Sequence, residues 1–179
     1  MILRAATIQD APALAALYGH HVIEGVGTFE ETPPSPEQME ARRAAVVVHG
    51  LPWLVAELNG RMLGFAYAGP FRMRSAYRHT VEDSVYIAPD VQRTGVGRTL
   101  LAAVIARCEA MGLRQMVAVI GDSGNASSIG LHAALGFEAA GVGPGLGYKQ
   151  GRWLDVVWMV RPLNGGTASL PTGPGLDLG

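Results

Sequence analysis

Residues 92–98, Gln-Arg-Thr-Gly-Val-Gly-Arg, have the composition of a loop that binds an anion. They follow the run 81–87, whose valine, tyrosine and isoleucine residues are typical of a buried strand. From position 96 to 111 apolar residues recur at helical spacing. The first N–H groups of a helix lack internal partners and lie at the positive end of the helix dipole. The order strand, loop and helix therefore predicts an anion site at the start of the helix.

Phosphate is the ligand that this loop suits best. Gly95 and Gly97 have no Cβ, so a phosphate can approach the backbone closely, and Arg93 and Arg98 add positive charge. The segment lacks the Gly-x-x-x-x-Gly-Lys-Ser/Thr pattern of a P-loop, and Leu100 replaces the third glycine of a dinucleotide fingerprint. An ordinary glycine-rich turn is the alternative on this short pattern alone.

A second candidate site is the segment 69–79, just before the strand. Arginine matches carboxylate and phosphinate groups with a two-pronged fork of N–H donors, so the segment can form a wall that binds such an anion. A solvated loop is the alternative. The segment concentrates three arginines and two aromatic residues, namely Phe71, Arg72, Arg74, Tyr77 and Arg78.

The segment 28–34 carries Phe29 and Glu30 ahead of two prolines, which exclude a regular element. A stiff loop with an aromatic ring and a carboxylate can wall a pocket for a cationic amine. From local sequence alone, a simple linker is the favoured interpretation.

The elements that must position these segments alternate between strands and helices, which predicts an α/β chain. Asn59-Gly60 is a strong hairpin signal because both residues accept positive φ. Asn125 is expected to cap a helix that Gly136 closes. The expected strands are 2–6, 53–58, 61–67, 81–87, 115–120 and 152–160. The first expected helix begins with a capping box at 7–10 and is ended by Gly25 and Gly27, and the others are 36–48, 96–111 and 126–135.

Composition limits the classes of protein that remain. The 179 residues predict one domain, 1–163, and a Gly/Pro-rich tail, 164–179. A net charge of −1 offers no basic footprint for nucleic acid, and no apolar run is long enough to span a bilayer. Cys108, the single cysteine, suits a reducing compartment and is expected to be buried. We therefore expect a cytoplasmic protein that uses no nucleic acid or membrane.

Histidines offer no clear metal site. His20 and His21 are adjacent, point to different sides of a helix and have no ligand partners, so they are interpreted as structural. His132 lies within the predicted helix 126–135, where a lone histidine is usually a core or surface residue. No metal is expected.

The spacing Gln92-x-x-Gly95-x-Gly97 after a strand resembles the acyl-CoA pyrophosphate loop of the GNAT superfamily of N-acetyltransferases. The order of elements also matches that superfamily over about residues 2–162. The resemblance implies a mixed α/β (α+β) fold, with a central sheet of about seven strands flanked by four helices.

The resemblance is closer to one branch, the phosphinothricin and methionine sulfoximine or sulfone N-acetyltransferases. Several independent stretches agree in order, which makes the assignment more specific than any single motif. They include 28–30, 52–57, 66–70, 76–77, 82–86, 117–121, 131–136 and 151–155.

The branch implies acetyl-CoA as the cosubstrate and direct transfer in a ternary complex. Glu82 is the implied general base, and His132 occupies the place of the tyrosine that protonates the leaving thiolate in many superfamily members. A carboxylate in a partly dry cleft has a raised pKa and serves as a base near neutral pH. The implied cofactor-binding residues are Val85, Tyr86, Ile87, Arg93, Thr94, Gly95, Val96, Gly97, Arg98, Asn125 and Ser128.

The implied substrate is a small amino-acid analogue that is acetylated on its α-amine, and the implied assembly is a homodimer. Two alternatives stay open: an acetyltransferase for another amine, such as a peptide N-terminus, and a non-catalytic acyl-CoA sensor. A sensor would need no base, so Glu82 argues against it. The implied substrate-binding residues are Phe29, Glu30, Arg72, Arg74, Ser75, Ala76, Tyr77 and Glu82.

Overall fold

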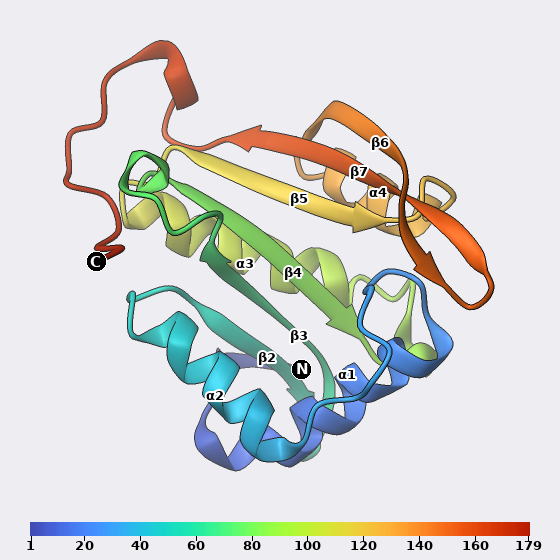
Figure 1. Cartoon of the computed structure of the whole chain (residues 1–179). Coiled ribbons are helices and arrows are strands. Elements are labelled where there is room, and N and C mark those ends of the chain that lie inside the picture. The colour runs from blue at the N-terminus through green and yellow to red at the C-terminus, as the bar shows by residue number, and fades with distance from the viewer.

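The computed structural model describes residues 1–179 as one mixed sheet with helices on both faces (Figure 1). The strand order is β1-β2-β3-β4-β5-β7-β6, and β4 and β5 are the one parallel pair. The predicted fold class is confirmed. The strands are β1 Ile2–Ala5, β2 Trp53–Leu58, β3 Arg61–Pro70, β4 Thr80–Ile87, β5 Gln115–Gly121, β6 Glu138–Lys149 and β7 Arg152–Pro162. The α-helices are α1 Ala11–Glu24, α2 Pro36–Val47, α3 Val96–Ala110 and α4 Ala126–Ala133.

Local chemistry sets several of these boundaries. Asn59 and Gly60 turn the β2–β3 hairpin with φ values of 51° and 77°, as the sequence predicted. The Ser35 side chain accepts a hydrogen bond from the Gln38 N–H and starts α2. The Asn125 side chain accepts from the Ser128 N–H and starts α4.

The sheet opens between β4 and β5. Their parallel register runs only from Thr80 opposite Gln115 to Asp83 opposite Ala118, although β4 continues to Ile87 and β5 to Gly121. Beyond that point the two facing edges carry backbone groups with no ladder partner. An opening lined by backbone N–H and C=O groups that lie outside the strand ladder is thus built into the middle of the sheet.

Side chains of β4 alternate between the two faces of the sheet. Tyr86 packs edge-on against Tyr18 of α1, with the ring centroids 4.9 Å apart, so Glu82 and Ser84 share the face covered by α1 and α2. Asp83 bonds to His132 of α4 and lies on the opposite face, which α3 also covers. The strand therefore presents different chemistry to each side of the opening.

Both faces are held by apolar cores. On the α3 face the fully buried residues include Leu100, Leu101 and Val104, which carry the predicted helical spacing. On the α1–α2 face Leu14 and Phe65 are fully buried. Close packing on both sides keeps β4 rigid up to the opening.

The chain after β7 is not a free extension. Residues 164–179 contain one short 3₁₀ turn, Gly166–Ala168, and then run along one side of the molecule, near the start of β4, until Leu176 is buried (Figure 1). The Gly141–Gly147 stretch lies inside β6, where two register shifts accommodate it.

Candidate active site

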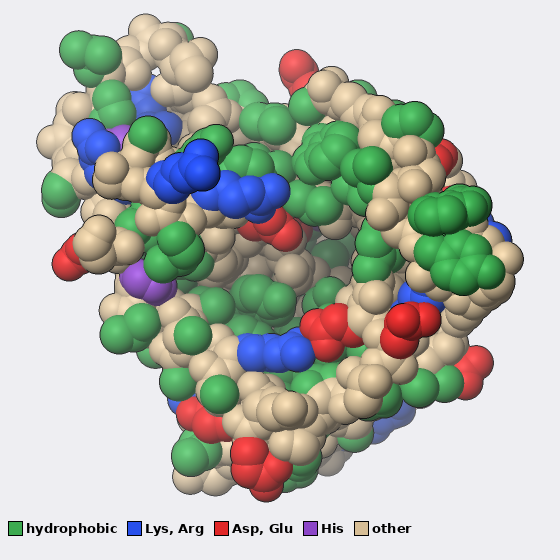
Figure 2. Space-filling view, viewed as in Figure 1, with side chains coloured by type: hydrophobic (Ala, Val, Ile, Leu, Met, Phe, Trp, Pro, Cys, Tyr) green, Lys and Arg blue, Asp and Glu red, His purple; other side chains and the backbone are tan.

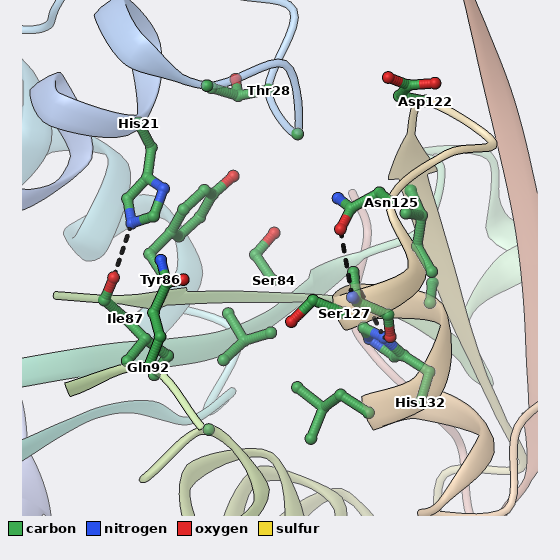
Figure 3. Close-up of a pocket in the computed structure, with 18 of the residues that line it drawn as sticks. His21, Thr28, Ser84, Tyr86, Ile87, Gln92, Asp122, Asn125, Ser127 and His132 are labelled. Atoms are coloured by element: carbon green, nitrogen blue, oxygen red, sulfur yellow. Dashed lines mark hydrogen bonds between the residues drawn. The ribbon is translucent and has the colours of Figure 1, made fainter. Parts of the chain in front are cut away.

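A cavity of about 600 Å³ occupies the opening between β4 and β5 (Figure 3). Its walls come from α1, the loop that follows α1, β4, the 92–98 loop, the end of β5 and the start of α4. Segments more than 100 residues apart in the chain therefore meet around it. The predicted residues among its lining are Val85, Tyr86, Ile87, Arg93, Gly95, Gly97, Arg98, Asn125, Ser128 and His132.

The 92–98 loop forms one end of the cavity. Gly95 precedes the first turn of α3 with φ +90°, and a Cβ added there would meet no atom within 4 Å. Only glycine adopts this φ without strain, and the open space lies where an anion can approach the N–H groups of α3.

Two of the predicted loop residues do not line the cavity. The Thr94 hydroxyl donates to the Val91 carbonyl at 2.6 Å, and Val96 is buried in the core. Both residues therefore hold the loop in place through contacts on the side away from the cavity. Gln92, which the motif contains, does line the cavity.

The free edge of β4 is held in place by a residue interpreted from sequence as structural. His21 lines the cavity, and its Nε2 lies 2.9 Å from the Ile87 carbonyl oxygen (Figure 3). Burial lowers the pKa of His21, which favours a neutral ring that donates from Nε2. No local pattern reveals this contact, because its acceptor is a backbone atom 66 positions away.

On the α3 and α4 face, the cavity is lined by a buried ion pair. His132 Nε2 lies 3.0 Å from Asp83 Oδ2, and the two side chains are 4% and 1% exposed. His132 Nδ1 lies 2.7 Å from the Ser128 carbonyl, so both ring nitrogens have partners. Burial works to lower the pKa of His132, but the hydrogen bond and charge of Asp83 outweigh it and raise that pKa. The sequence did not single out Asp83.

The segment after β5 completes this side. Asn125 and Ser128 both line the cavity, and the Ser128 N–H donates to Asn125 Oδ1 at 3.2 Å. Asp122 and Ser127 also line it and were not predicted. For Ser127, the available sequence signal was its position in the first turn of the helix that Asn125 caps.

Glu82 occupies the other side of β4. Its side chain is 33% exposed, and its nearest cation is Arg72, with Nη1 3.7 Å from Oε2. Burial raises the pKa of Glu82, the positive charge of Arg72 opposes this, and the neighbouring Asp83 charge adds to it. The predicted base therefore has the raised pKa that a base near neutral pH needs.

The arginine-rich segment lies beside Glu82. The Arg72 guanidinium stacks over the Phe71 ring at 4.3 Å and donates to the Phe71 carbonyl. Tyr77 packs edge-on against the same ring, with centroids 5.6 Å apart. Residues Ser75–Tyr77 form a 3₁₀ turn, and Arg74 is exposed. The predicted substrate residues 72–77 thus form one rim over β4.

Glu30 lies across from that rim but already has partners. Its carboxylate receives two N–H groups of Arg42, at 2.7 and 3.0 Å, and the Tyr18 hydroxyl at 2.8 Å. Burial opposes ionisation, but these hydrogen bonds outweigh it and lower the pKa of Glu30. The sequence did not reveal that Arg42 and Tyr18 share this group.

Phe29 reaches across the opening and packs where two strands carry glycine. A Cβ at Gly121 would lie 2.9 Å from the Phe29 ring, and one at Gly147 would overlap that ring. Lys149, which is buried, donates from Nζ to the Thr28 carbonyl at 2.8 Å. The loop after α1 is thereby fixed to β5 and β6.

Figure 2 shows a hollow on this face, with hydrophobic side chains on its floor and basic and acidic side chains on its rim. The structure contains no cluster of three or more His, Cys, Asp or Glu side chains that could hold a metal ion. The arrangement suits proton transfer by Glu82 at a small polar ligand.

Comparison with known proteins gives consistent matches. Residues 3–158 match the family model described as an acetyltransferase (GNAT) domain. The chain is 58% identical to a phosphinothricin N-acetyltransferase of Alcaligenes faecalis over 163 residues, which cover 91% of this chain and 83% of the relative. It is 43% identical to an L-methionine sulfoximine/L-methionine sulfone acetyltransferase of Pseudomonas paraeruginosa over 158 residues, covering 88% and 91%.

A crystal structure of a phosphinothricin acetyltransferase from Sinorhizobium meliloti in complex with AcCoA is similar to this fold, with a TM-score of 0.93 and 45% identity. The match covers 97% of this chain and 94% of that one. These matches agree with the resemblance inferred from the sequence.

Proposed function

Since the chain belongs to the GNAT acetyltransferase family, we propose that it acetylates the α-amine of small amino-acid analogues of the phosphinothricin and methionine sulfoximine or sulfone type. The predictions of family and enzyme class are confirmed. The observation that carries the proposal is the placement of Glu82. It is a part-buried carboxylate with a raised pKa, beside an arginine and on the opposite face of β4 from the Asp83–His132 pair.

The cavity between β4 and β5 fits acetyl-CoA, the acetyl donor of this enzyme. The open space at Gly95 and the first N–H groups of α3 suit the pyrophosphate, and Arg93 and Arg98 add charge. The unpaired edge of β4 at Val85–Ile87 suits the amides of the pantetheine arm. Bound there, acetyl-CoA supplies a thioester at the point where the two strands separate.

Glu82 removes the proton that blocks reaction. The α-amine of an amino acid is protonated at neutral pH and can attack a thioester only after it loses a proton. Glu82 accepts that proton through a water, and its raised pKa makes it a better base than an exposed glutamate. Arg72 limits the rise in pKa, which keeps Glu82 ionised.

His132 supplies a proton to the leaving group. The attacking nitrogen still carries two hydrogens after Glu82 has accepted one proton. As the C–N bond forms and the C–S bond breaks, its second proton passes to water and the CoA sulfur leaves as a thiolate. His132 lines the cavity, and its raised pKa favours the protonated ring. Both ring nitrogens are hydrogen-bonded, so the ring donates to that sulfur when one N–H leaves its partner, the Ser128 carbonyl or Asp83. Backbone N–H groups at the free edge of β4 stabilise the charge on the acyl oxygen.

The acceptor amino acid binds in the hollow between the two loops. Arg72 and Arg74 grip its carboxylate and its tetrahedral phosphorus or sulfur group, and Tyr77 packs against its side chain. Ser75 and Ala76 form the turn that carries Tyr77. Phe29 and Glu30 form the facing wall, where the Glu30–Arg42 pair offers polar groups of both signs.

The two alternative functions find less support. A peptide substrate needs an open groove, whereas the loop after α1 is fixed across β5 and β6 by Phe29 and Lys149. A sensor without catalysis gives no role to the raised pKa of Glu82.

A homodimer remains part of the proposal. Exposed apolar side chains gather on the β6–β7 hairpin, where Leu146, Tyr148 and Trp153 are 61%, 59% and 68% exposed. Patches of this kind mark association surfaces, and a twofold contact is the usual geometry. We expect light scattering at micromolar concentration to show twice the 18.8 kDa chain mass, and a purely monomeric species would contradict the dimer.

The cytoplasmic location also remains a prediction. None of the helices has the length and apolar character required to cross a membrane.

The experiment that tests the proposed substrate compares thiol release from acetyl-CoA with four acceptors: L-phosphinothricin, L-methionine sulfoximine, L-methionine sulfone and a short peptide. We expect the three analogues to turn over and the peptide to be poor. Arg72→Ala or Arg74→Ala should raise KM for the analogues. Fastest turnover of the peptide, or an unchanged KM in both variants, would overturn the substrate assignment.

A further inference from the structure

We infer that the C-terminal segment 164–179 is part of the acceptor site, because it holds the 71–79 loop in the position that binds the amino acid. The inference rests on the proposed function, which places the acceptor beside that loop. Gly175 and Leu176 are the positioning residues, and Arg114 anchors the segment. We retain residues 1–163 as the proposed catalytic domain and assign the segment 164–179 the role of positioning its 71–79 loop.

One end of the segment is fixed by a buried arginine. Arg114, at the start of β5, is 8% exposed. Its guanidinium donates to the Gly166 carbonyl at 2.9 and 2.6 Å and to the carbonyl and hydroxyl of Ser169 at 2.9 and 2.8 Å. Arg114 has no carboxylate partner, so these hydrogen bonds to the segment compensate for the burial of its charge. An anchor of this kind makes a free tail unfavourable.

The other end is seated against the loop and α2. The Leu176 N–H donates to the Arg78 carbonyl at 2.7 Å, and the Leu176 side chain is 6% exposed within the core. At the next residue, the Asp177 carbonyl lies 2.9 Å from Nδ1 of His49, which follows α2. The segment therefore runs from β5 past the 71–79 loop to the end of α2 (Figure 1).

The loop depends on this contact. At its ends the Phe71 N–H donates to the Thr80 carbonyl, and the His79 carbonyl accepts from the N–H groups of Arg114 and Gln115. Within 72–78 the hydrogen bonds are internal, from the Tyr77 N–H to the Arg74 carbonyl and from the Arg78 N–H to the Ser75 carbonyl. Between residues 72 and 78, the Leu176–Arg78 bond is the one backbone hydrogen bond to a residue outside the loop. A loop held by few hydrogen bonds opens readily when one is lost.

Gly175 shows how closely the two segments fit. It has φ +77°, and a Cβ there would lie 2.6 Å from the Arg78 carbonyl oxygen and 2.9 Å from the His79 ring. Any side chain at position 175 must therefore push the segment and the loop apart. Gly173, two residues earlier, would place a Cβ in open space. The chain thus offers two glycine-to-alanine changes with opposite expectations.

The consequence for catalysis falls on one substrate only. Arg72 lies on this loop and reaches Glu82, so displacing the loop disturbs the grip on the amino acid. No residue of 164–179 lines the cavity for acetyl-CoA. A merely structural role would instead reduce the amount of folded enzyme. That would lower the maximal rate and leave KM unchanged for both substrates.

The test uses the full-length enzyme with Gly175→Ala and Gly173→Ala. Trypsin cleaves after arginine, and the loop carries three arginines, so the cleavage rate at 72–78 reports how well the loop is held. We expect Gly175→Ala to speed this cleavage about tenfold and to raise KM for the amino acid about fivefold or more, with KM for acetyl-CoA changed less than about twofold. Gly173→Ala should match the wild type.

An unchanged cleavage rate in Gly175→Ala would overturn the inference, and so would faster cleavage with an unchanged KM for the amino acid. Arg72→Ala decides separately whether the loop binds the acceptor, so failure of the proposed function is distinguishable. Should Gly175→Ala fold poorly, Leu176→Ala replaces it, compared with Val104→Ala, which changes a buried residue of α3 outside the segment and the loop. Equal effects of these two variants on KM for the amino acid would also overturn the inference.

Discussion

The two sides of β4 are built in different ways. The cavity proposed for acetyl-CoA draws its walls from segments far apart in the chain, but it offers the ligand mainly the 92–98 loop and backbone groups at a strand edge and a helix start. The hollow proposed for the acceptor uses charged and polar side chains from α1, α2, two loops and β4, whose contacts join residues 10 to 12 positions apart in the chain. We therefore expect the first side to be sensitive to changes in backbone geometry and the second to changes in charge.

The largest expected effect belongs to the acceptor side. Glu82→Gln removes the proton acceptor while preserving shape, so kcat should fall by about 10²–10⁴-fold. Affinity for acetyl-CoA, measured by calorimetry, should stay near that of the wild type because Glu82 does not line the cavity. A near-normal rate for Glu82→Gln between pH 6 and 9 would show that another residue is the base. The acceptor side would then not depend on the charge of Glu82.

The Asp83–His132 pair lies on the cavity side and should matter more for stability. Asp83→Ala leaves a buried imidazolium without its partner, so the free energy of unfolding should fall by about 3–5 kcal/mol. Chemical denaturation measures this change, and Glu82→Gln serves as the comparison on the same strand. A loss of less than about 1 kcal/mol would show that the pair is not held as the structure describes.

The pH dependence of that pair has a definite sign. The folded-state pKa of His132 is raised above 6.5, so its stabilising contribution is complete below that pH and is lost as pH rises through the folded pKa. The difference in unfolding free energy between wild type and His132→Gln should therefore shrink from pH 6 to pH 9. A difference that grows over this range would contradict the raised pKa. His132→Ala should also slow catalysis less than Glu82→Gln does.

A smaller effect is expected from the backbone of the cofactor loop. Gly95→Val places a side chain in the open space proposed for the pyrophosphate, and the acetyl-CoA dissociation constant should rise at least about tenfold, roughly 1.4 kcal/mol. Gly112→Val is a matched control, because Gly112 also has positive φ and open space but lies outside the cavity. Equal losses in both variants would point to backbone strain rather than to a blocked site.

The smallest effect concerns the pH profile. The Arg72 charge lowers the pKa of Glu82, so Arg72→Ala should raise that pKa further. Since Glu82 acts in its ionised form, the acidic limb of the kcat/KM profile should move to higher pH. A limb that moves to lower pH, or does not move, would show that Arg72 does not lower the pKa of the base.

The same difference explains what the sequence predicted. The 92–98 loop, the Asn59-Gly60 turn and the Asn125 cap depend on neighbours in the chain, so local pattern was sufficient. Resemblance supplied Glu82 and His132, which no local pattern distinguishes. It did not supply the partners Asp83 and Arg42, because each pairing depends on how two elements pack, β4 with α4 and the loop after α1 with α2, and not on a local pattern.

His21 and the tail show a second limit. The His21 partner is a backbone carbonyl, and every residue type has one, so the sequence does not indicate which residue accepts this hydrogen bond. The glycines and prolines of 164–179 have the composition of a free tail, yet Leu176 and its backbone bond to Arg78 hold the segment in place. Composition measures the average tendency of a segment, whereas one buried leucine and one buried arginine decide where this segment lies.

The most direct test of the division between the two sides is an acetyl-CoA titration of Gly95→Val and Arg72→Ala beside a steady-state KM for the amino acid. The account predicts a weakened acetyl-CoA affinity in Gly95→Val alone and a raised amino-acid KM in Arg72→Ala. Loss of acetyl-CoA affinity in Arg72→Ala, with that of Gly95→Val unchanged, would contradict it.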